Sequence, residues 1–502
     1  MMTVHLRIND AATGQPMPVR LRITGPDGEY FAPFGRLAEF ATGKNEDVGG
    51  NLWLNRERWC SIDGACEIQL PSGVPLRIQA LKGPELTPLD ETVTLGPGQM
   101  ALRFAVARWS NVREQGWHPG DTRVHFTTPH TAALDAASED VGVVNLLACE
   151  QRISGLDGHT YPTQTNLTAF SGQSLALQTD STLVAVNTLN IHPVLGRVAL
   201  LHSHRVVYPL SFGGADHSDD WSVSDWCDQC HRKNGLTVWV EPFEPEAGIL
   251  GGEALVALIN GKIDAIEYDG HTRKQPLIPW WYRLLNTGFA VPLVAGSGKD
   301  RNTIAIGSPR TYACISNEPL TYTNWINAVR AGRCFVTNGP MMTFHVDDAQ
   351  PGGRINLSNP EQSLKIRASA ESLFRFDKLE VVANGEVIAT APSAARAGRW
   401  DATLELEYAA VQSGWLAARC SGPAGLLAPK QPLFAHTSPV YVTVANRPQA
   451  LRPLPVQLLR QAVEATRNWI DEHGRFADEK AKAKLLRYCE EAVGKLDTAN
   501  IR

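Results

Sequence analysis

Histidines are concentrated in one stretch of this chain. Of the fourteen histidines in 502 residues, ten lie between residues 118 and 271. Histidine titrates near neutral pH and is the commonest metal ligand, so the concentration indicates a catalytic or metal-binding region. Most single histidines are nevertheless surface residues or hydrogen-bonded core residues. The ten are His118, His125, His130, His159, His192, His202, His204, His217, His231 and His271.

The spacing of these histidines tests for a metal site. Two histidines spaced as His-x-His on a strand point to the same face, where they can share an ion. The one such pair in the sequence is His202 and His204. The segment GDTRVH has the same form, with Arg123 in place of the first histidine and His125 as the second.

A Cys-x-x-Cys-His run occurs at Cys227, Cys230 and His231. This spacing is used for covalent haem attachment. The run lies in an expected helix, no distal iron ligand is evident, and no second Cys-x-x-Cys follows at the spacing of a zinc ribbon. We therefore favour thiols that pack within a helix, with a metal or redox role as the alternative.

A glycine-containing turn, GSGKD at 296–300, follows the apolar run VPLVA. Its glycines would let backbone amides approach a ligand, and Lys299 and Asp300 would project at the end of a strand. The turn is a candidate for binding an anion or a carbonyl group, with a plain tight turn as the alternative. No nucleophile elbow, Walker loop or dinucleotide-binding glycine motif follows a strand.

Charge and composition limit the partners of the chain. Lys and Arg number 47 against 52 Asp and Glu, a formal net charge of −5, so no excess positive charge is available for nucleic acid or an anionic membrane. No apolar run approaches the length of a membrane span. We expect a small-molecule ligand or substrate, no nucleic acid and no membrane. The oligomeric state stays open.

The cysteines and the start of the sequence bear on the compartment. No secretory signal is visible and the nine cysteines are an odd, scattered set, so we expect a cytoplasmic protein.

The hydrophobic patterns divide the chain into four regions. They predict a multidomain protein that combines α/β and all-β regions. Residues 1–112 show short strand-like runs separated by turn clusters, which predicts an N-terminal β-sandwich. Residues 113–340 alternate strand-like and helix-like stretches, which predicts a β/α barrel with its chemistry at the strand ends. Residues 341–446 return to short strands, with a hairpin signal at ANGEVI, and predict a second sandwich. Residues 447–502 contain two helical patterns that pack on the body of the protein.

The stretch from residue 120 to about 340 resembles the carbaryl-hydrolase-like (CehA/McbA-type) branch of the polymerase-and-histidinol-phosphatase (PHP) superfamily. The resemblance implies a distorted (β/α)7 barrel flanked by β-sandwich modules. It also implies divalent metals at the strand ends that activate water to hydrolyse esters, carbamates or phosphoesters. The phrases that carry it are GDTRVHFTTPHTAALDAASEDVGVVNLLA, FSGQ, HPVLGRVALLHSHRVVYPLSFGG, WWYRLLNTGFAVPLVAGSGKD, RTYACI and YTNWINAVRAGRCFVTNGPMM.

The metal-ligand positions implied by this resemblance are replaced at all but one place, His125. The family's first His-x-His ends at His125 but begins with Arg123, and its closing Ser-Asp-x-His is Ser297-Gly298-Lys299-Asp300. The other replacements are Asn145-Leu146 for Asp-His, Ser174 for the glutamate after Gln173, Arg197 for a histidine and Glu241-Pro242 for His-Pro.

These replacements change the chemistry expected of the pocket. Arg123, Arg197 and Lys299 would repel Zn²⁺ or Mn²⁺ and favour an anionic ligand. Glu241 and Asp300 would pair with these cations and, together with His125, supply acid/base catalysis. The predicted catalytic residues are therefore His125, Glu241 and Asp300, and the predicted ligand-binding residues are Arg123, Gln173, Arg197, Ser297, Lys299 and Glu267.

Three functions remain open. The first is a hydrolase-like protein that binds a small anionic or polar, including carbohydrate-like, ligand and needs no metal cofactor. The second is a metal-dependent hydrolase of esters, carbamates or phosphoesters, in which Zn or Mn is held by a remodelled ligand set. The third is a non-catalytic binding pseudoenzyme, in which tryptophans could stack on sugars, although buried packing is the commoner role. The remodelled set would come from His125, Glu241, Asp300, His202, His204, Glu267 and His271.

Overall fold

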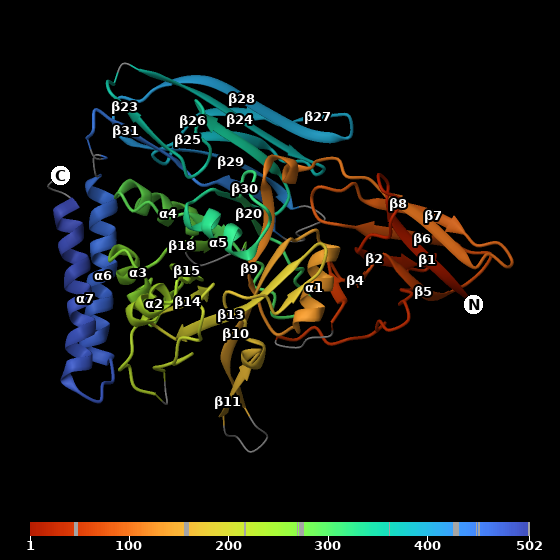
Figure 1. The fold of residues 1–502 in the computed structure, drawn as a ribbon, viewed down its shortest axis with the longest axis horizontal. Coiled ribbons are helices and arrows are strands. Elements are labelled where there is room, and N and C mark those ends of the chain that lie inside the picture. Colours follow the sequence, from red (N-terminus) through yellow and green to blue (C-terminus); the bar gives the residue numbers. More distant parts are fainter. Residues whose placement is uncertain are drawn as a thin grey trace.

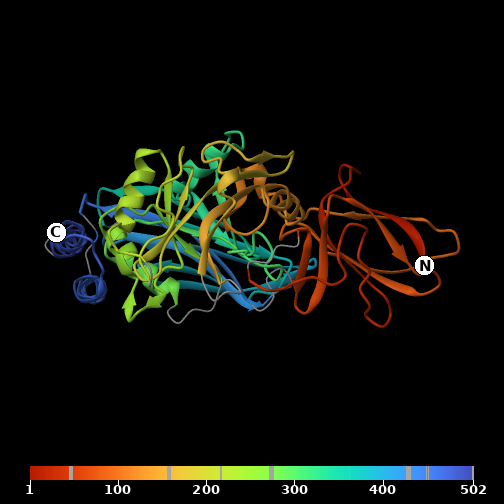
Figure 2. The ribbon, with the colours of Figure 1, turned by 90° about the horizontal axis from the view of Figure 1, so that it is seen from below.

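The protein is a strand-rich mixed α/β molecule with several sheets. The computed structural model describes residues 1–44, 49–154, 160–214, 217–268, 270, 276–360, 362–424, 431–447, 449 and 452–499. The N-terminal strands lie at one end of the molecule and helices α6 and α7 at the other (Figures 1 and 2).

The N-terminal strands form two sheets that share one hydrophobic cluster. Strand β1 alternates buried and more exposed residues, as its apolar alternation predicts, and buries Val4, Leu6 and Ile8 against Leu21 and Ile78. The first sheet has the order β5 (Ala65–Leu70), β1 (Met2–Asp10) and β8 (Ala101–Val106). The second has the order β3 (Asn51–Leu54), β4 (Glu57–Ile62), β2 (Val19–Thr24), β6 (Pro75–Leu81) and β7 (Leu89–Thr94).

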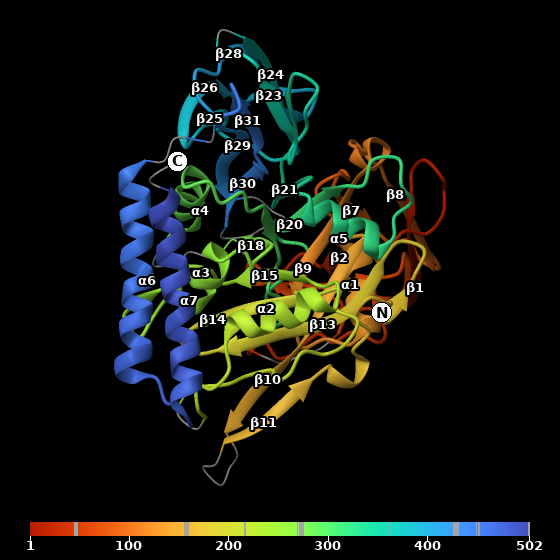
Figure 3. The ribbon, with the colours of Figure 1, turned by 60° about the vertical axis from the view of Figure 1, so that its left-hand side comes forward.

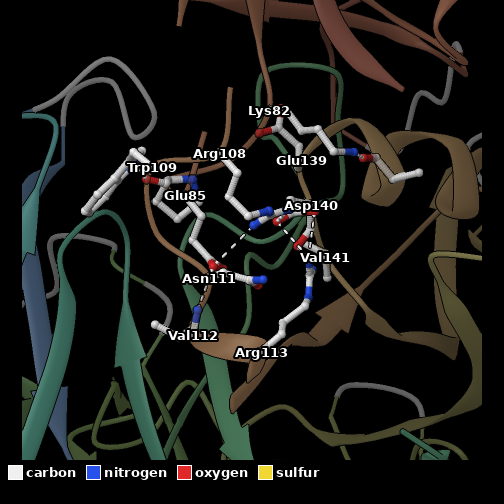
Figure 4. A network of polar contacts seen from close by, with 12 residues as sticks. Lys82, Glu85, Arg108, Trp109, Asn111, Val112, Arg113, Glu139, Asp140 and Val141 are labelled. Carbon is white, nitrogen blue, oxygen red and sulfur yellow. Dashed lines mark hydrogen bonds and ion pairs between the residues drawn. The ribbon is translucent and has the colours of Figure 1, made fainter. Parts of the chain in front are cut away.

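A buried ion network fastens these strands to the central part of the chain (Figure 4). Asp140 lies between two arginines and accepts hydrogen bonds from Arg108 at 2.9 Å and from Arg113 at 3.0 Å. Glu85 accepts from the Tyr312 hydroxyl at 2.8 Å and from Arg108 at 3.3 Å. Burial raises the pKa of Asp140, but the charges of the surrounding cations, Arg113 first, outweigh it and hold this pKa below its usual value.

The central strands are hydrogen-bonded in sequence, and their directions decide which residues meet. Strands β9, β10 and β13 are parallel, β14 is antiparallel to both β13 and β15, and β15, β18 and β19 are parallel again. A bridge between Val124 and Lys299 brings the segment after β19 beside the end of β9. The bounds are β9 Trp117–Val124, β10 Val143–Ser154, β13 Leu183–His192, β14 Gly196–Leu201, β15 Leu236–Val240, β18 Ala265–Tyr268, β19 Leu293–Ala295, β20 Arg310–Cys314 and β21 Cys334–Thr337.

Helices alternate with several of these strands, in line with the alternation of strand-like and helix-like stretches over residues 113–340. The side chains of Thr128, Ser222 and Thr321 cap the first turns of α1, α2 and α5 by accepting a backbone N–H. The helices are α1 Pro129–Ser138, α2 Val223–Arg232, α3 Gly252–Ile259, α4 Leu277–Asn286 and α5 Tyr322–Arg330. Shorter elements are β11 Thr160–Thr165, β12 Leu177–Gln178, β16 Pro245–Glu246, β17 Ile249–Leu250 and the 3₁₀ turns Val112–Gln115 and Leu167–Ala169.

The strands after residue 340 form a second strand-rich region. The ANGEVI hairpin is confirmed, since β25 and β26 pair antiparallel around Asn384 and Gly385, which both have positive φ, at 49° and 88°. One sheet has the order β22 (Met341–Val346), β24 (Ser363–Ser372), β28 (Arg399–Ala409) and β27 (Ala394–Arg396). Strands β23 (Arg354–Leu357), β25 (Lys378–Ala383), β26 (Glu386–Pro392), β29 (Gly414–Ala424), β30 (Pro432–Thr437) and β31 (Val440–Val444) join the central strands through β21 and β30.

Two long helices close the chain, as the helical patterns predict. Helices α6 (Pro453–His473) and α7 (Glu479–Ala499) lie side by side and pack beside α3 (Figure 3). Leu459 and Val463 of α6 and Leu485 of α7 are fully buried in the same hydrophobic cluster as α3. Across the described ranges, no helix combines the length and the apolar character needed to cross a membrane.

Candidate functional site

The antiparallel direction of β14 brings two predicted site residues to one edge of the central strands. Arg197 is at the start of β14 and pairs in register with Val240, the last residue of β15. Glu241 follows β15 directly, so its carboxylate lies beside the Arg197 guanidinium and the two form an ion pair. The sequence placed Arg197 at the end of a strand. It lies at the beginning of one, and the reversed strand carries it to the same edge.

Two further predicted residues extend this contact into the interior. Arg123, in β9, donates from Nε to Glu267 Oε1 at 2.6 Å, and its NH1 lies 3.4 Å from Glu241 Oε1. The Thr122 hydroxyl donates to the other oxygen of Glu267 at 2.9 Å. Glu267 thus accepts two hydrogen bonds on a fully buried side chain, which a carboxylate requires when it is removed from water.

The outer end of this ion-pair cluster reaches solvent. The Arg197 and Glu241 side chains are 33% and 27% exposed, whereas the Arg123 and Glu267 side chains are buried. Glu246 lies 3.9 Å from Arg197 on the outer side. A cavity of about 20 Å³ adjoins the pair, lined by residues that include His192, Trp239 and Phe243. This volume holds about one water molecule, so a larger ligand must reach Arg197 from its exposed side.

Backbone conformation at this edge is unusual. Glu241 has a positive φ of 51°, and Phe243 has 59°. Phe126, two residues after β9 at the same edge, has a value of 53°. Residues other than glycine, asparagine and aspartate seldom adopt this left-handed conformation, and such strain is often found where a protein must aim a functional side chain.

Asp121 holds the predicted residues in place, and sequence reasoning missed it. Its carboxylate accepts backbone N–H groups from Arg123 at 2.9 Å, Ser297 at 3.0 Å and Gly307 at 2.8 Å. Burial raises the pKa of Asp121, while these hydrogen bonds act in the opposite direction. Its place in GDTRVH, two residues before Arg123, is the sequence signal that could have identified it. Thr122 and Glu246 were missed as well.

His125 is buried beside the cluster, as a neutral imidazole. Burial, followed by the charge of Arg123, lowers the pKa of His125 to about 3. Within the described ranges no hydrogen-bond partner reaches its Nδ1. Its backbone N–H donates to the Lys299 carbonyl at 2.7 Å. An imidazole with so low a pKa is a weak general base near neutral pH, so His125 is less suited to that role than the sequence suggested.

Asp300 is held by its neighbour rather than by the cluster. The Arg301 guanidinium donates to its two oxygens at 2.8 and 3.2 Å, and Lys44 lies 3.9 Å away. Burial raises the pKa of Asp300, but the Arg301 hydrogen bond and charge outweigh it and hold this pKa below its ordinary value. Asp300 is therefore an ionised carboxylate with an adjacent counter-charge.

Lys299 and the amides of its turn face internal groups, whereas the sequence predicted that they bind a ligand. The Lys299 ammonium donates to the backbone carbonyls of Arg301 at 3.3 Å and Ile304 at 3.2 Å, not to Glu241. The amides of Ser297, Gly298 and Lys299 donate to Asp121, to the Arg123 carbonyl and to Ser297 Oγ respectively. Because internal acceptors already take these amides, the turn does not present them to an anion.

The remaining candidate residues either lie apart from the ion-pair cluster or fall outside the residues that the structure describes. Gln173 donates to the Lys233 carbonyl at 3.3 Å, and His204 contacts the same carbonyl. His202 contacts Thr323 at 3.0 Å and the Asn234 carbonyl at 3.3 Å. His271 lies outside the described residues.

The thiols of the cysteine run and the side chains of most of the candidate tryptophans are buried in the protein core. Cys227 and Cys230 are buried in α2, and burial raises the pKa of both thiols, so the prediction of packing thiols fits. Six tryptophans between residues 117 and 281 are the candidates for stacking on sugars. Five of them are core residues, which removes them as a binding surface, and Trp221 is partly buried. The five are Trp117, Trp226, Trp239, Trp280 and Trp281.

No group of three or more His, Cys, Asp or Glu side chains among the described residues has a metal-binding arrangement. Comparisons of the chain with family models, with curated proteins and with solved structures gave no match. The PHP resemblance therefore remains a prediction drawn from the sequence motifs.

Proposed function

We propose that this chain is a hydrolase-like protein of the PHP type, whose strand-edge pocket binds a small anionic or polar ligand through Arg197 and Arg123. In this proposal the central strands are a distorted (β/α)7 barrel and the two flanking strand-rich regions are β-sandwiches. The ring of neighbours from β9 through β19, with the Val124–Lys299 bridge back to β9, supports the barrel.

The observation that carries the proposal is the partly exposed ion pair between Arg197 and Glu241. A planar guanidinium binds carboxylate and phosphate oxygens through paired hydrogen bonds. A ligand anion that approaches Arg197 from solvent would replace Glu241 as its partner. Arg123 would then keep Glu241 close, since it lies 3.4 Å from the same carboxylate.

The same exchange gives a route to catalysis. Once displaced from Arg197, Glu241 would be a carboxylate beside a bound ligand and within reach of solvent, which are the requirements for a general base that activates water. Asp300, paired with Arg301, and His125, buried and neutral, have less suitable surroundings for that role. Among the three predicted catalytic residues, Glu241 therefore carries the reaction in this proposal.

Ligand titration in the presence of EDTA tests the proposal. Glucuronate and glycerol phosphate are suitable anionic probes, with glucose as the uncharged comparison and calorimetry as the readout. We expect the anions to bind with EDTA present, and Arg197→Gln to weaken binding about tenfold or more through loss of charged hydrogen bonds. Arg205→Gln, at an exposed position, is the matched control. Binding that needs added metal, or that Arg197→Gln leaves unchanged, would contradict the proposal.

A further inference from the structure

A second cavity lies between α4 and the strands of the C-terminal region. Its volume is about 480 Å³, within the range of small-molecule sites, which are often found where two parts of a chain meet. Helix α4 contributes one wall, and strands β25, β29 and β30 contribute the other. The lining residues that matter here are Tyr282, Lys378, Glu380, Arg419, Ser421 and Phe434.

The strand register places polar residues on one face in two rows. Lys378 of β25 pairs with Ser421 of β29, which pairs with Phe434 of β30. The next row toward the interior is Glu380, Arg419 and His436. Because side chains alternate along a strand, these residues all point to the face that α4 covers.

The next row of the sheet toward the interior is apolar, so the polar residues are confined to the two rows beside the cavity. Val382 pairs with Ala417, and both are fully buried in the hydrophobic cluster that includes α4. An interface that needed only to pack would continue this apolar character outward. The two polar rows instead border an open volume.

Hydrogen bonds fix the orientation of the groups in the inner row. His436 Nδ1 lies 2.7 Å from the Thr437 carbonyl, so this nitrogen carries the proton of the neutral ring. The Tyr282 hydroxyl then donates to His436 Nε2 at 2.6 Å, and its oxygen accepts from Arg419 NH1 at 3.2 Å. Arg419 Nε donates to Glu380 Oε2 at 2.8 Å. These two contacts use two of the five N–H donors of Arg419.

The groups around the cavity sum to one positive charge at neutral pH. Burial raises the pKa of Glu380, but hydrogen bonds from Lys378 and Arg419 outweigh it and hold this pKa low, so Glu380 is ionised. Burial raises the pKa of Tyr282 to about 12 and lowers that of His436 to about 3, so both are neutral. Two cations, Lys378 and Arg419, thus face one carboxylate. Apolar contact is available from Phe434, Ile278 and Pro279.

We propose that this cavity is a binding site for a small organic monoanion, a carboxylate with an apolar or aromatic body. The carboxylate would accept hydrogen bonds from Arg419 and Lys378, and the apolar body would lie against Phe434 and Ile278. The Lys378 ammonium, on a side chain that is 46% exposed, is at the entrance. The site is separate from the Arg197–Glu241 pair and does not depend on the proposed function.

Titration of the full-length protein with benzoate tests this site. Phenyl phosphate, benzyl alcohol and benzylamine serve as the dianionic, uncharged and cationic comparisons, and calorimetry gives the affinity. We expect benzoate to bind with a dissociation constant of about 1 mM or lower, more tightly than all three comparisons. Tighter binding of phenyl phosphate would reassign the site to phosphate esters and overturn the carboxylate proposal.

Variants locate the binding. We expect Arg419→Gln to weaken benzoate binding about tenfold or more and Lys378→Met about threefold, through loss of charged hydrogen bonds. Arg396→Gln, on an exposed side chain of β27 that pairs with Asp401, is the control and should have no effect. Lys378→Met carries the test if Arg419→Gln does not fold, because Lys378 is at the surface. Absence of benzoate binding, or binding lost in Arg197→Gln but retained in both pocket variants, would overturn the proposal.

Discussion

At the scale of single residues, the state of His125 has a measurable consequence for stability. Its pKa is about 3 in the folded protein, below the ordinary histidine value near 6.5, so the unfolded chain binds a proton that the folded chain refuses. The stability that His125 contributes is complete above about pH 6.5 and is lost as the pH falls toward 3. Between pH 6.5 and 5 the loss amounts to about 2 kcal/mol.

Urea unfolding of the wild type and of His125→Asn at pH 7.5 and pH 5.0 measures this contribution. We expect the variant to lose about 2 kcal/mol less than the wild type between the two pH values. His130→Asn, at an exposed position, should keep the wild-type pH dependence. Equal pH dependence in wild type and His125→Asn would show that His125 is not buried as a neutral ring.

Residue types predicted part of the candidate site. The replacement pattern singled out Arg123, Arg197 and Glu241, and these three meet. Arg123 also pairs with Glu267, which was named separately as a ligand-binding residue. Lys299 was assigned to the same group on its position alone, but its ammonium contacts backbone carbonyls in its own loop. The path of a loop and the rotamer of a long side chain depend on packing that residue type does not encode.

At the scale of elements, the ion network around Asp140 joins the N-terminal strands to the central part of the chain. Asp140→Asn keeps the shape of the side chain and suits its positive φ of 60°, but it removes the negative charge between Arg108 and Arg113. We expect a loss of about 3 kcal/mol in the free energy of unfolding, because two largely buried guanidiniums would lose their counter-charge.

Urea unfolding of matched variants checks this estimate. Asp90→Asn removes the same charge from a pair with Arg77 in which both side chains are about half exposed, and it should cost under about 1 kcal/mol. Similar losses in the two variants would mean that the Asp140 network contributes no more than a surface ion pair.

Strand direction is what the sequence could not supply at this scale. The apolar runs VGVVNLLA, LVAVNTL, LTVWVEP and DAIEY predict strands, and they form β10, β13, β15 and β18. The helix-like stretch VSDWCDQCHRKN forms α2, which begins after the capping residue Ser222. Hydrophobic periodicity reveals that a strand exists but not which way it runs. The antiparallel direction of β14 brings Arg197 to Glu241. This direction depends on the connections between β13, β14 and β15, and the local hydrophobic pattern of β14 does not encode it.

At the scale of the whole molecule, the C-terminal helices are part of the body of the protein. Leu459 of α6 is fully buried in the cluster that contains α3, while Leu454 of the same helix is largely exposed. We expect Leu459→Ala to lower the free energy of unfolding by about 3 kcal/mol, since it leaves a cavity in a shared core.

Leu454→Ala is the control within the same helix and should change stability by no more than about 0.5 kcal/mol. Chemical denaturation followed by both circular dichroism and tryptophan fluorescence checks the two variants. If Leu459→Ala unfolds α6 and α7 in a separate early transition and leaves the main transition unchanged, the helices are an independent unit and this account of them is wrong.

We propose that the arginines at the strand edge beside Glu241 exclude divalent metal and bind an anion, and the metal content of the protein tests this proposal. The measurement is plasma mass spectrometry of the untagged protein, before and after incubation with Zn²⁺, Mn²⁺ and Fe²⁺ and then desalting. We predict far less than one equivalent under every condition, because guanidinium groups at the edge repel divalent cations. Stoichiometric metal that is lost in a Glu241→Ala/Asp300→Ala variant would contradict the claim and favour a metal-dependent hydrolase.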